Sequence, residues 1–277
     1  MTGPTPPALP DELLQLTRRL RLPYLRNNAP EVIATAKAQR WDPAEVLRVL
    51  LQEEAKGRDI ATRETRRHQA AFPTGKSFAT WREEDSSIPI AIQRALRTLE
   101  WIGRAETLSV SGPSGTGKSH FVEAIGHAAI DAGLKVSWFT LETLTQTITR
   151  SKVDASTTKV VQRICRSDLI VVDDIGMLPA GQAEAEALYR MVDAAYERRS
   201  LAVTSNIHPS GFDTLMPKAL AGPTVDRLLG VAGSNPAPPT TRKSRSGEVG
   251  SNGRSLQMIL SIGCSPRLVR EWRAFRF

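Results

Sequence analysis

The chain has 277 residues, of which 40% are hydrophobic and 24% charged. This length allows a sizeable core in one large domain, or in one domain with appendages, and argues against a small disulfide-stabilised scaffold. The net charge of +8 favours an anionic partner such as nucleic acid. Residues 230–277 contain eight basic and two acidic residues and so supply +6 of that charge, which leaves the rest of the chain only mildly basic.

The two cysteines, Cys165 and Cys264, stand outside any CxxC motif or Cys/His cluster, so the sequence predicts neither a metal site nor a disulfide framework built on them. Cys165 is expected to be a buried free thiol. The N-terminal stretch MTGPTPPALPDELL lacks the basic and apolar segments of a signal peptide, and no apolar run is long enough to span a bilayer. We therefore expect a cytoplasmic protein with no membrane partner.

The N-terminal part of the chain has a helical pattern. Residues 1–10 are rich in proline and are predicted to be disordered, whereas residues 11–103 are predicted to form an all-α N-terminal domain. Asp11 is predicted to cap the first helix, and Asp42, followed by Pro43, to cap a longer one that continues through the basic segment RETRRHQ. Apolar residues at helical spacing in this longer helix predict a buried stripe: Val46, Leu47, Leu50 and Leu51. The stretch PTGKSFATW is predicted to break the helix, and IPIAIQRALRTLEWIG to form another.

Residues 104–229 alternate between strand and helix patterns. The predicted strands are TLSVSG, KVSWFT, DLIVVDD and SLAVTSN, and the predicted helices between them include KSHFVEAIGHAAIDAG and AEAEALYRMVDAAYERR. This alternation predicts an α/β domain with a parallel sheet. DLIVVDD is continuously apolar until its two aspartates, as expected of a central strand that is buried on both faces. Residues 230–277 are rich in Gly, Pro, Ser and Arg without periodicity and are predicted to form a disordered basic tail.

A phosphate-binding loop is predicted at residues 112–119, which read GPSGTGKS. The pattern is a glycine, four variable residues, and then Gly-Lys-Ser, between a predicted strand and a predicted helix. Glycines let successive backbone N–H groups point at phosphate oxygens, and the helix N-terminus adds partial positive charge. We expect a nucleotide as the ligand, with Lys118 near its β- and γ-phosphates and the Ser119 hydroxyl as a ligand of Mg²⁺. The predicted binding residues are Gly112, Pro113, Ser114, Gly115, Thr116, Gly117, Lys118 and Ser119.

Two acids follow the predicted strand in LIVVDDIG. In P-loop ATPases such a strand ends in an acid that holds Mg²⁺, and Asp173 fits that role. Asp174 would polarise the attacking water, unless it is only a solvated loop residue. Many such enzymes have glutamate at this second position, so the shorter Asp174 predicts hydrolysis that is slow or that depends on a partner.

Two further residues have both a functional and an ordinary interpretation. Asn206 follows a predicted strand and could bind the attacking water or the γ-phosphate, although asparagine is also common in turns. Arg227 could reach the γ-phosphate of a neighbouring subunit. It could equally be an exposed helix arginine paired with a nearby acid such as Asp226.

The basic segment at residues 63–69 is a candidate DNA contact. Arg63, Arg66 and Arg67 could neutralise DNA phosphates. Most charge runs are solvated helix faces, however, and pairing with Glu64 along the helix is an alternative.

Six stretches occur in an order that resembles a known family: LRLPYLRNN, FPTGKSFATW, GPSGTGKSH, LIVVDDIGMLP, YERRSLAVTSN and VDRLL. They are similar to those of the IstB-like ATPases, helper proteins of bacterial DNA transposition. These proteins are related to replicative helicase loaders and belong to the AAA+ class. The resemblance covers residues 20–229. GPSGTGKSH alone is common to all P-loop proteins, whereas its combination with LRLPY, DDIGMLP and TSN is much more specific.

The resemblance implies a P-loop AAA+ ATPase core with a five-stranded sheet, preceded by the helical N-terminal domain. It implies that ATP promotes assembly of a homo-oligomer on duplex DNA, which captures target DNA and recruits or stimulates a partner transposase. Asn206 then becomes a sensor and Arg227 an inter-subunit finger. The N-terminal domain and its basic segment become DNA- or partner-contacting candidates.

The sequence departs from the family after Leu229, where it continues GVAGSNPAPPTTRKSRSG. The change in composition suggests a frameshifted or recombined end and predicts a core that lacks its final strand. Two other functions stay open: a replicative helicase loader, and a nucleotide-switched scaffold with little turnover, which the shorter Asp174 favours. A small-molecule kinase would need an arginine-rich lid, which the sequence does not indicate.

Overall fold

The computed structural model describes residues 8–176, 181–214, 216–229 and 258–261. The chain divides into two compact units, Met1–Arg66 and Arg67–Phe277. The predicted domain boundary after residue 103 lies inside the second unit. Three residues just before that boundary are buried in the core of the second unit: Leu96, Trp101 and Ile102. They share one hydrophobic cluster with the strand at residues 107–111 and the helix at residues 118–131. Their burial explains why residues 67–103 fold with the core and not with the N-terminal helices.

The first unit consists of helices α1 (Asp11–Arg19), α2 (Pro23–Gln39) and the part of α3 (Pro43–Ala70) that precedes residue 67. Glu54 is buried and joins α2 to α3, because its carboxylate accepts hydrogen bonds from the Leu25 N–H at 2.8 Å and from Arg58 at 2.7 Å. Gly57 lies against Tyr24 so closely that a Cβ atom there would be 2.1 Å from the ring. The two helices can approach this closely only with glycine at that position.

Some predictions for this unit are confirmed and others are wrong. Asp42 caps α3 through a 2.8 Å hydrogen bond from the Ala44 N–H to its side chain, as predicted. Asp11 is instead the first residue of α1, after Pro10, where its charge still favours the helix N-terminus. The predicted buried stripe is wrong, because Leu47 and Leu51 are 58% and 50% exposed. Residues 1–7 lie outside the described residues, but Leu9, inside the segment predicted to be disordered, is buried.

A parallel sheet forms the centre of the second unit, as predicted. Its strands are β1 (Thr107–Ser111), β2 (Val136–Thr140), β3 (Leu169–Ile175), β4 (Ser200–Ser205) and β5 (Met258–Ser261). They lie in the order β2-β3-β4-β1-β5, and every described pairing is parallel. The carboxyl ends of β1, β3 and β4 therefore meet at the same edge of the sheet.

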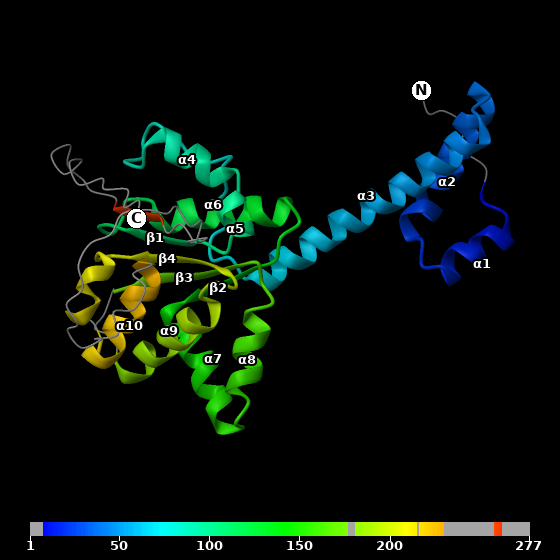
Figure 1. The fold of residues 1–277 in the computed structure, drawn as a ribbon. Helices are drawn as coiled ribbons and strands as arrows, with labels where there is room; N and C mark the ends of the chain where they lie inside the picture. The colour runs from blue at the N-terminus through cyan, green and yellow to red at the C-terminus, as the bar shows by residue number, and fades with distance from the viewer. Residues whose placement is uncertain (1–7, 177–180, 215, 230–257, 262–277) are drawn as a thin grey trace, which may run out of the picture. The chain divides into compact units, whose positions relative to one another are not determined.

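Helices cover both faces of this sheet (Figure 1). Helices α4 (Ile90–Arg97), α5 (Glu100–Gly103) and α6 (Lys118–Asp131) cover one face, and α7 (Leu141–Val153), α8 (Thr157–Ile164), α9 (Gln182–Ala195) and α10 (Lys218–Leu229) cover the other. Alternate residues of β3 show this division, since Leu169 and Val171 join the first cluster while Ile170 and Val172 join the second. Burial on both faces explains why the strand reads as one apolar run.

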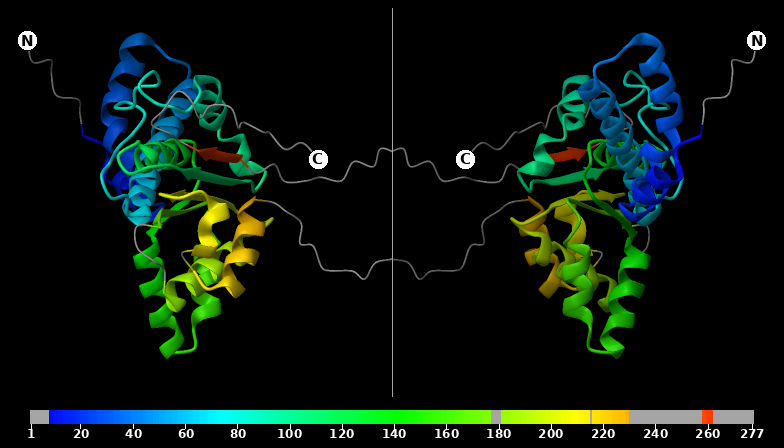
Figure 2. Two further views of the ribbon diagram at one scale, coloured as in Figure 1. Left: turned by 90° about the vertical axis from the view of Figure 1, so that its left-hand side faces the viewer. Right: turned by 90° about the vertical axis from the view of Figure 1, so that its right-hand side faces the viewer.

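The predicted loss of the final strand is wrong. Met258–Ser261 pairs in parallel with β1 as the fifth strand, and Figure 2 shows it in red beside β1. The short apolar patch in an otherwise polar segment supplies this strand, whereas the rest of the predicted tail lies outside the described residues. Helices α7 and α8 form where the sequence reasoning predicted no element. No helix among the described residues is long and apolar enough to cross a membrane.

Candidate nucleotide-binding site

The phosphate-binding loop follows β1 and leads into α6, in the predicted context of strand, loop and helix. Gly115 and Gly117 have φ angles of +82° and +86°, which residues with side chains rarely adopt. Gly117 is the N-cap of α6, so the first N–H groups of the helix lack carbonyl partners within that helix. The glycines thus create a turn whose backbone can bind phosphate oxygens.

Lys118 lies at the centre of the site and is only 6% exposed. Its ammonium group donates hydrogen bonds to the Pro113 carbonyl oxygen at 2.8 Å and to Asn206 Oδ1 at 3.0 Å. Burial lowers the pKa of Lys118, while the carboxylates of Asp174 and Asp173 act in the opposite direction. A bound phosphate would add negative charge beside this ammonium group and favour its protonated form.

Ser119 and Asp173, the two residues expected to hold Mg²⁺, lie within hydrogen-bond distance of each other. The Ser119 hydroxyl donates to Asp173 Oδ1 at 2.9 Å, and Asp173 is 7% exposed at the end of β3. The hydroxyl of Thr204, on neighbouring β4, also donates to the same carboxylate oxygen. Carboxylate and hydroxyl oxygens are the ligands that Mg²⁺ prefers, so Ser119 and Asp173 fit this ion. Among the described residues, no group of three or more His, Cys, Asp or Glu side chains forms a separate metal site.

Asp174 stands next to these residues with an unusual backbone. Its φ angle is +68°, and its N–H donates to the Thr204 hydroxyl at 2.9 Å. Burial raises the pKa of Asp174, the charge of Asp173 raises it further, and Lys118 lowers it. A carboxylate with a raised pKa is a better proton acceptor than an ordinary aspartate, which suits a residue that polarises water.

Asn206 brings the end of β4 to the phosphate-binding loop. Its side chain accepts the hydrogen bond from Lys118, and its backbone N–H donates to the Ile175 carbonyl oxygen at 3.0 Å. The Gly112 N–H donates to Ser205 O at 3.0 Å, which holds the start of the loop against the same strand end. The structure therefore joins the loop, the acids and Asn206 in one cluster.

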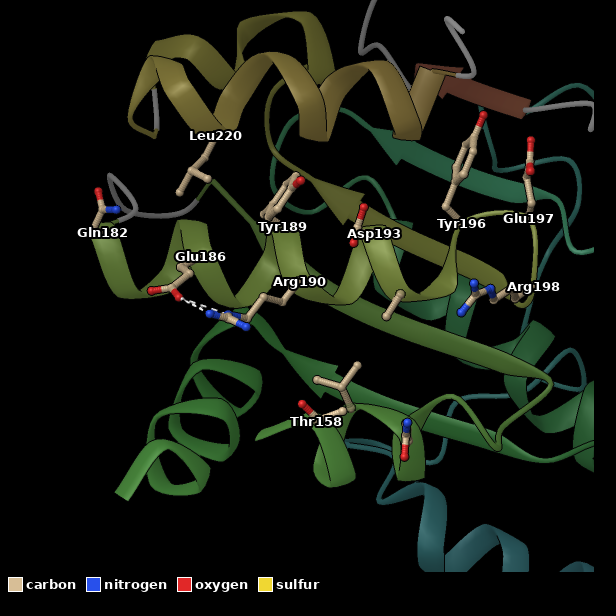
Figure 3. Close-up of a pocket in the computed structure, with 13 residues that line it drawn as sticks. Thr158, Gln182, Glu186, Tyr189, Arg190, Asp193, Tyr196, Glu197, Arg198 and Leu220 are labelled. Atoms are coloured by element: carbon tan, nitrogen blue, oxygen red, sulfur yellow. Dashed lines mark hydrogen bonds and ion pairs between the residues drawn. The ribbon is translucent and has the colours of Figure 1, made fainter. Parts of the chain in front are cut away.

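Arg227 lies on α10 and pairs with Asp193 on α9. The guanidinium nitrogen is 2.7 Å from the carboxylate, and the group also lies 5.4 Å from the centre of the Tyr189 ring. Asp193 and Tyr189 line an open groove of about 1110 Å³ along α9. In Figure 3 both side chains rise from α9 toward α10. No residue of the phosphate-binding loop is among the described residues that line this groove.

The predicted DNA contacts lie on α3, and each is only partly exposed. Arg67 forms an ion pair with Asp131 at the end of α6, so part of its charge is already compensated within the chain. Cys165 is a free thiol, half-buried and not fully buried as predicted, and burial raises its pKa.

Sequence reasoning missed Thr204, which connects both acids to β4. It is 1% exposed, and its hydroxyl donates to Asp173 and accepts the backbone N–H of Asp174. The only signal in the sequence is a polar residue inside the apolar run SLAVTSN, two places before Asn206. A buried hydroxyl must find partners, and β4 lies next to β3, so such a residue could have been expected to reach the acids.

The chain is similar to proteins of a known family. Residues 15–234 match the family described as IstB-like ATP binding protein. An ATP-binding protein of insertion sequence IS21 from Pseudomonas aeruginosa is 30% identical over 223 residues, which are 79% of this chain and 83% of that protein. An IS21-like ATP-binding protein from Bacteroides fragilis is 29% identical over 220 residues, which are 79% of this chain and 84% of that protein.

Among solved structures, the DnaC helicase loader is similar with a TM-score of 0.45 and 16% identity, over 56% of this chain and 92% of that one. AMPPCP-bound DnaA from Aquifex aeolicus has a TM-score of 0.46 and 15% identity, over 55% of this chain and 48% of that one. The family match covers far more than half of the sequence and includes the whole described site. The chain therefore belongs to the family of IstB-like ATP-binding proteins.

Proposed function

We propose that this protein is an ATP-dependent helper of DNA transposition. It binds ATP with Mg²⁺, hydrolyses it, assembles as a homo-oligomer on duplex DNA, and recruits or stimulates a partner transposase. One observation supports this proposal above the others: in a chain of the IstB-like family, Lys118 of the phosphate-binding loop donates to Asn206 and the adjacent Ser119 donates to Asp173. The relatives from insertion sequences support a transposase as the partner.

The arrangement of the site supports hydrolysis by a water molecule at the carboxyl edge of the sheet. The N–H groups of the loop and Lys118 would stabilise the charge that develops on the transferred phosphoryl group. Ser119 and Asp173 would hold Mg²⁺, which would supply positive charge to offset the negative charge of the phosphates. Asp174 would accept a hydrogen bond from the attacking water, and Asn206 would bind that water or the γ-phosphate.

Steady-state ATP hydrolysis with and without duplex DNA tests this function. We expect DNA to stimulate turnover, because assembly on DNA would bring Arg227 of one subunit to the nucleotide of the next. The control is Lys118→Ala, which should abolish nucleotide binding. ATP binding without turnover, whether DNA is present or absent, would instead support a nucleotide-switched scaffold. Stimulation by a replicative helicase and not by a transposase would support a helicase loader.

The basic segment of α3 is the proposed DNA contact. Neutralising Arg63, Arg66 and Arg67 together should weaken DNA binding and reduce its salt dependence by roughly 0.9 in log–log slope for each DNA phosphate that is no longer neutralised. A matched control neutralises three exposed basic residues of the second unit: Lys135, Arg150 and Lys159. An unchanged salt slope in the first variant, or an equal change in the control, would rule out this segment as the contact.

A further inference from the structure

Residues 67–81, here called the strap, run antiparallel to α6 along one face of the helix. At the C-terminal end of α6, Arg67 pairs with Asp131. One turn earlier, the Phe72 ring packs on His127, with their centroids 4.2 Å apart. A Cβ atom at Gly126 would lie 2.7 Å from the Phe72 ring, so the strap could not approach a bulkier residue this closely.

Glu123, at the middle of α6, holds the turn of the strap. It is 1% exposed, yet it carries a carboxylate that faces a cluster of donors. Oε1 accepts the backbone N–H groups of Thr74 at 3.2 Å, Gly75 at 2.5 Å and Lys76 at 3.2 Å, and Oε2 accepts the Thr74 hydroxyl at 2.6 Å. Four hydrogen bonds to one carboxyl group hold this turn against α6.

The end of the strap contacts the phosphate-binding loop itself. The Trp81 indole lies over Gly117, where a Cβ atom would be 3.2 Å from the ring, and packs edge-on to His120 with centroids 5.0 Å apart. The indole N–H donates to Gln93 Oε1 at 2.7 Å, and the Thr80 hydroxyl lies 3.2 Å from His120 Nε2. Trp81 is thus fixed on α4 and on the first turn of α6 at the same time.

We propose that Glu123 is a positioning residue for the nucleotide site and acts through Trp81. Glu123 fixes the turn at residues 74–76, the turn fixes Trp81, and the indole supports Gly117 in the left-handed conformation that the loop requires. The expected effect of Glu123 on nucleotide affinity rests on the proposed function, whereas its expected effect on the conformation of the loop does not. The positioning of the loop is a property of the chain itself.

Hydrogen–deuterium exchange of the full chain without nucleotide tests the positioning directly. In Glu123→Ala, we expect faster exchange of the backbone N–H groups of residues 115–119, which lie outside the substituted turn of the helix. Glu106→Ala is the matched control, because Glu106 is also a buried glutamate in an ion pair, with Arg104, but lies before β1 at its amino end. Unchanged exchange of residues 115–119 in Glu123→Ala would overturn the inference.

Calorimetric titration with ADP and Mg²⁺ tests the consequence. Glu123→Ala should weaken binding about tenfold, which corresponds to about 1.4 kcal/mol, near the value of one hydrogen bond to a charged group. Glu123→Gln keeps an oxygen for the three N–H groups and should recover most of the affinity. If lower stability alone caused the loss of ADP affinity, Glu106→Ala would lose as much affinity as Glu123→Ala. Because coupling between two sites is reciprocal, bound ADP should also slow the hydrogen exchange of backbone N–H groups in the strap.

The two proposals fail in different ways. If the parent protein does not bind ADP, the proposed function fails, while the exchange measurement still decides on the strap. If the parent binds ADP and Glu123→Ala binds it equally well, the functional consequence of the strap is refuted and the proposed function stands.

Discussion

Thr204→Val removes one buried hydroxyl and leaves a side chain of nearly the same shape. In the parent protein this hydroxyl donates to Asp173 and accepts the N–H of Asp174, so a single atom connects the two acids of the site. Valine keeps the packing of β4 but offers neither hydrogen bond. Both acids then lose a partner in a place where water has little access, since Thr204 is 1% exposed.

The size of the effect follows from these two hydrogen bonds. A hydrogen bond to a charged group contributes about 1.5–3 kcal/mol, and a buried N–H without a partner costs about 1–3 kcal/mol. The two bonds share one oxygen and are not independent, so we expect the free energy of unfolding to fall by about 2–4 kcal/mol. Thr204→Ser keeps the hydroxyl and removes one methyl group, which costs only about 1 kcal/mol.

Urea unfolding of the parent and both variants measures this difference, and steady-state hydrolysis measures its effect on the site. We expect Thr204→Val to slow Mg²⁺-dependent turnover, since Asp173 loses the hydrogen bond that orients it, while Thr204→Ser stays near the parent. If the serine variant lost as much stability and activity as the valine variant, the hydroxyl would not be the cause and the reasoning would be refuted.

Three further predictions concern single side chains. Asp174→Asn should bind ATP like the parent but hydrolyse it about 100-fold more slowly, because a neutral amide is a poor proton acceptor; equal turnover would remove Asp174 from its proposed role. Arg227→Ala should lower DNA-stimulated turnover on the order of 10³-fold, whereas its half-exposed pair with Asp193 contributes only about 0–1 kcal/mol to stability; a large loss of stability with full turnover would contradict this. Burial lowers the pKa of His127, and the positive charge of Arg67 lowers it as well. The negative charges of Glu123 and Asp131 raise it, but burial has the largest effect. The unfolded chain therefore binds this proton more readily, and the free energy of unfolding should fall as the pH drops below the ordinary histidine pKa of about 6.5. His127→Leu should remove that part of the slope, as urea unfolding between pH 5 and about 7.5 would show; an identical slope would contradict the assignment.

Much of the second unit could be predicted because its signals are local. The loop at residues 112–119 combines its own glycines with a strand before it and a helix after it, so its structure depends little on distant segments. The apolar run that ends at Asp173 and Asp174 likewise indicates a buried strand without knowledge of its neighbours. Asn206 was expected only as a candidate to bind the attacking water or the γ-phosphate, and its hydrogen bond from Lys118 was not predicted. The contact arises because β1 and β4 are parallel and end at the same edge of the sheet.

Features that depend on distant partners were missed or wrong. The strap looks like a helix break in the sequence, and only Glu123, about fifty residues later, gives its backbone N–H groups a partner. Leu47 and Leu51 have the spacing of a buried face, but periodicity states only that a face is apolar and not that a partner covers it. The division into compact units lies at residues 66 and 67 and not at residue 103, since a change from helices to strands need not separate two cores.

Strand β5 has a consequence for synthesis of the chain on the ribosome. Its residue Met258 pairs with Leu108, so 150 residues separate partners that lie side by side in the finished sheet. At 5–20 residues per second, roughly 8–30 s pass between translation of the two. During that interval the outer edge of β1 presents unpaired N–H and C=O groups, which are a template for pairing with another chain. A nascent chain or fragment that ends before residue 258 keeps this edge open, and we expect it to need a chaperone or to aggregate.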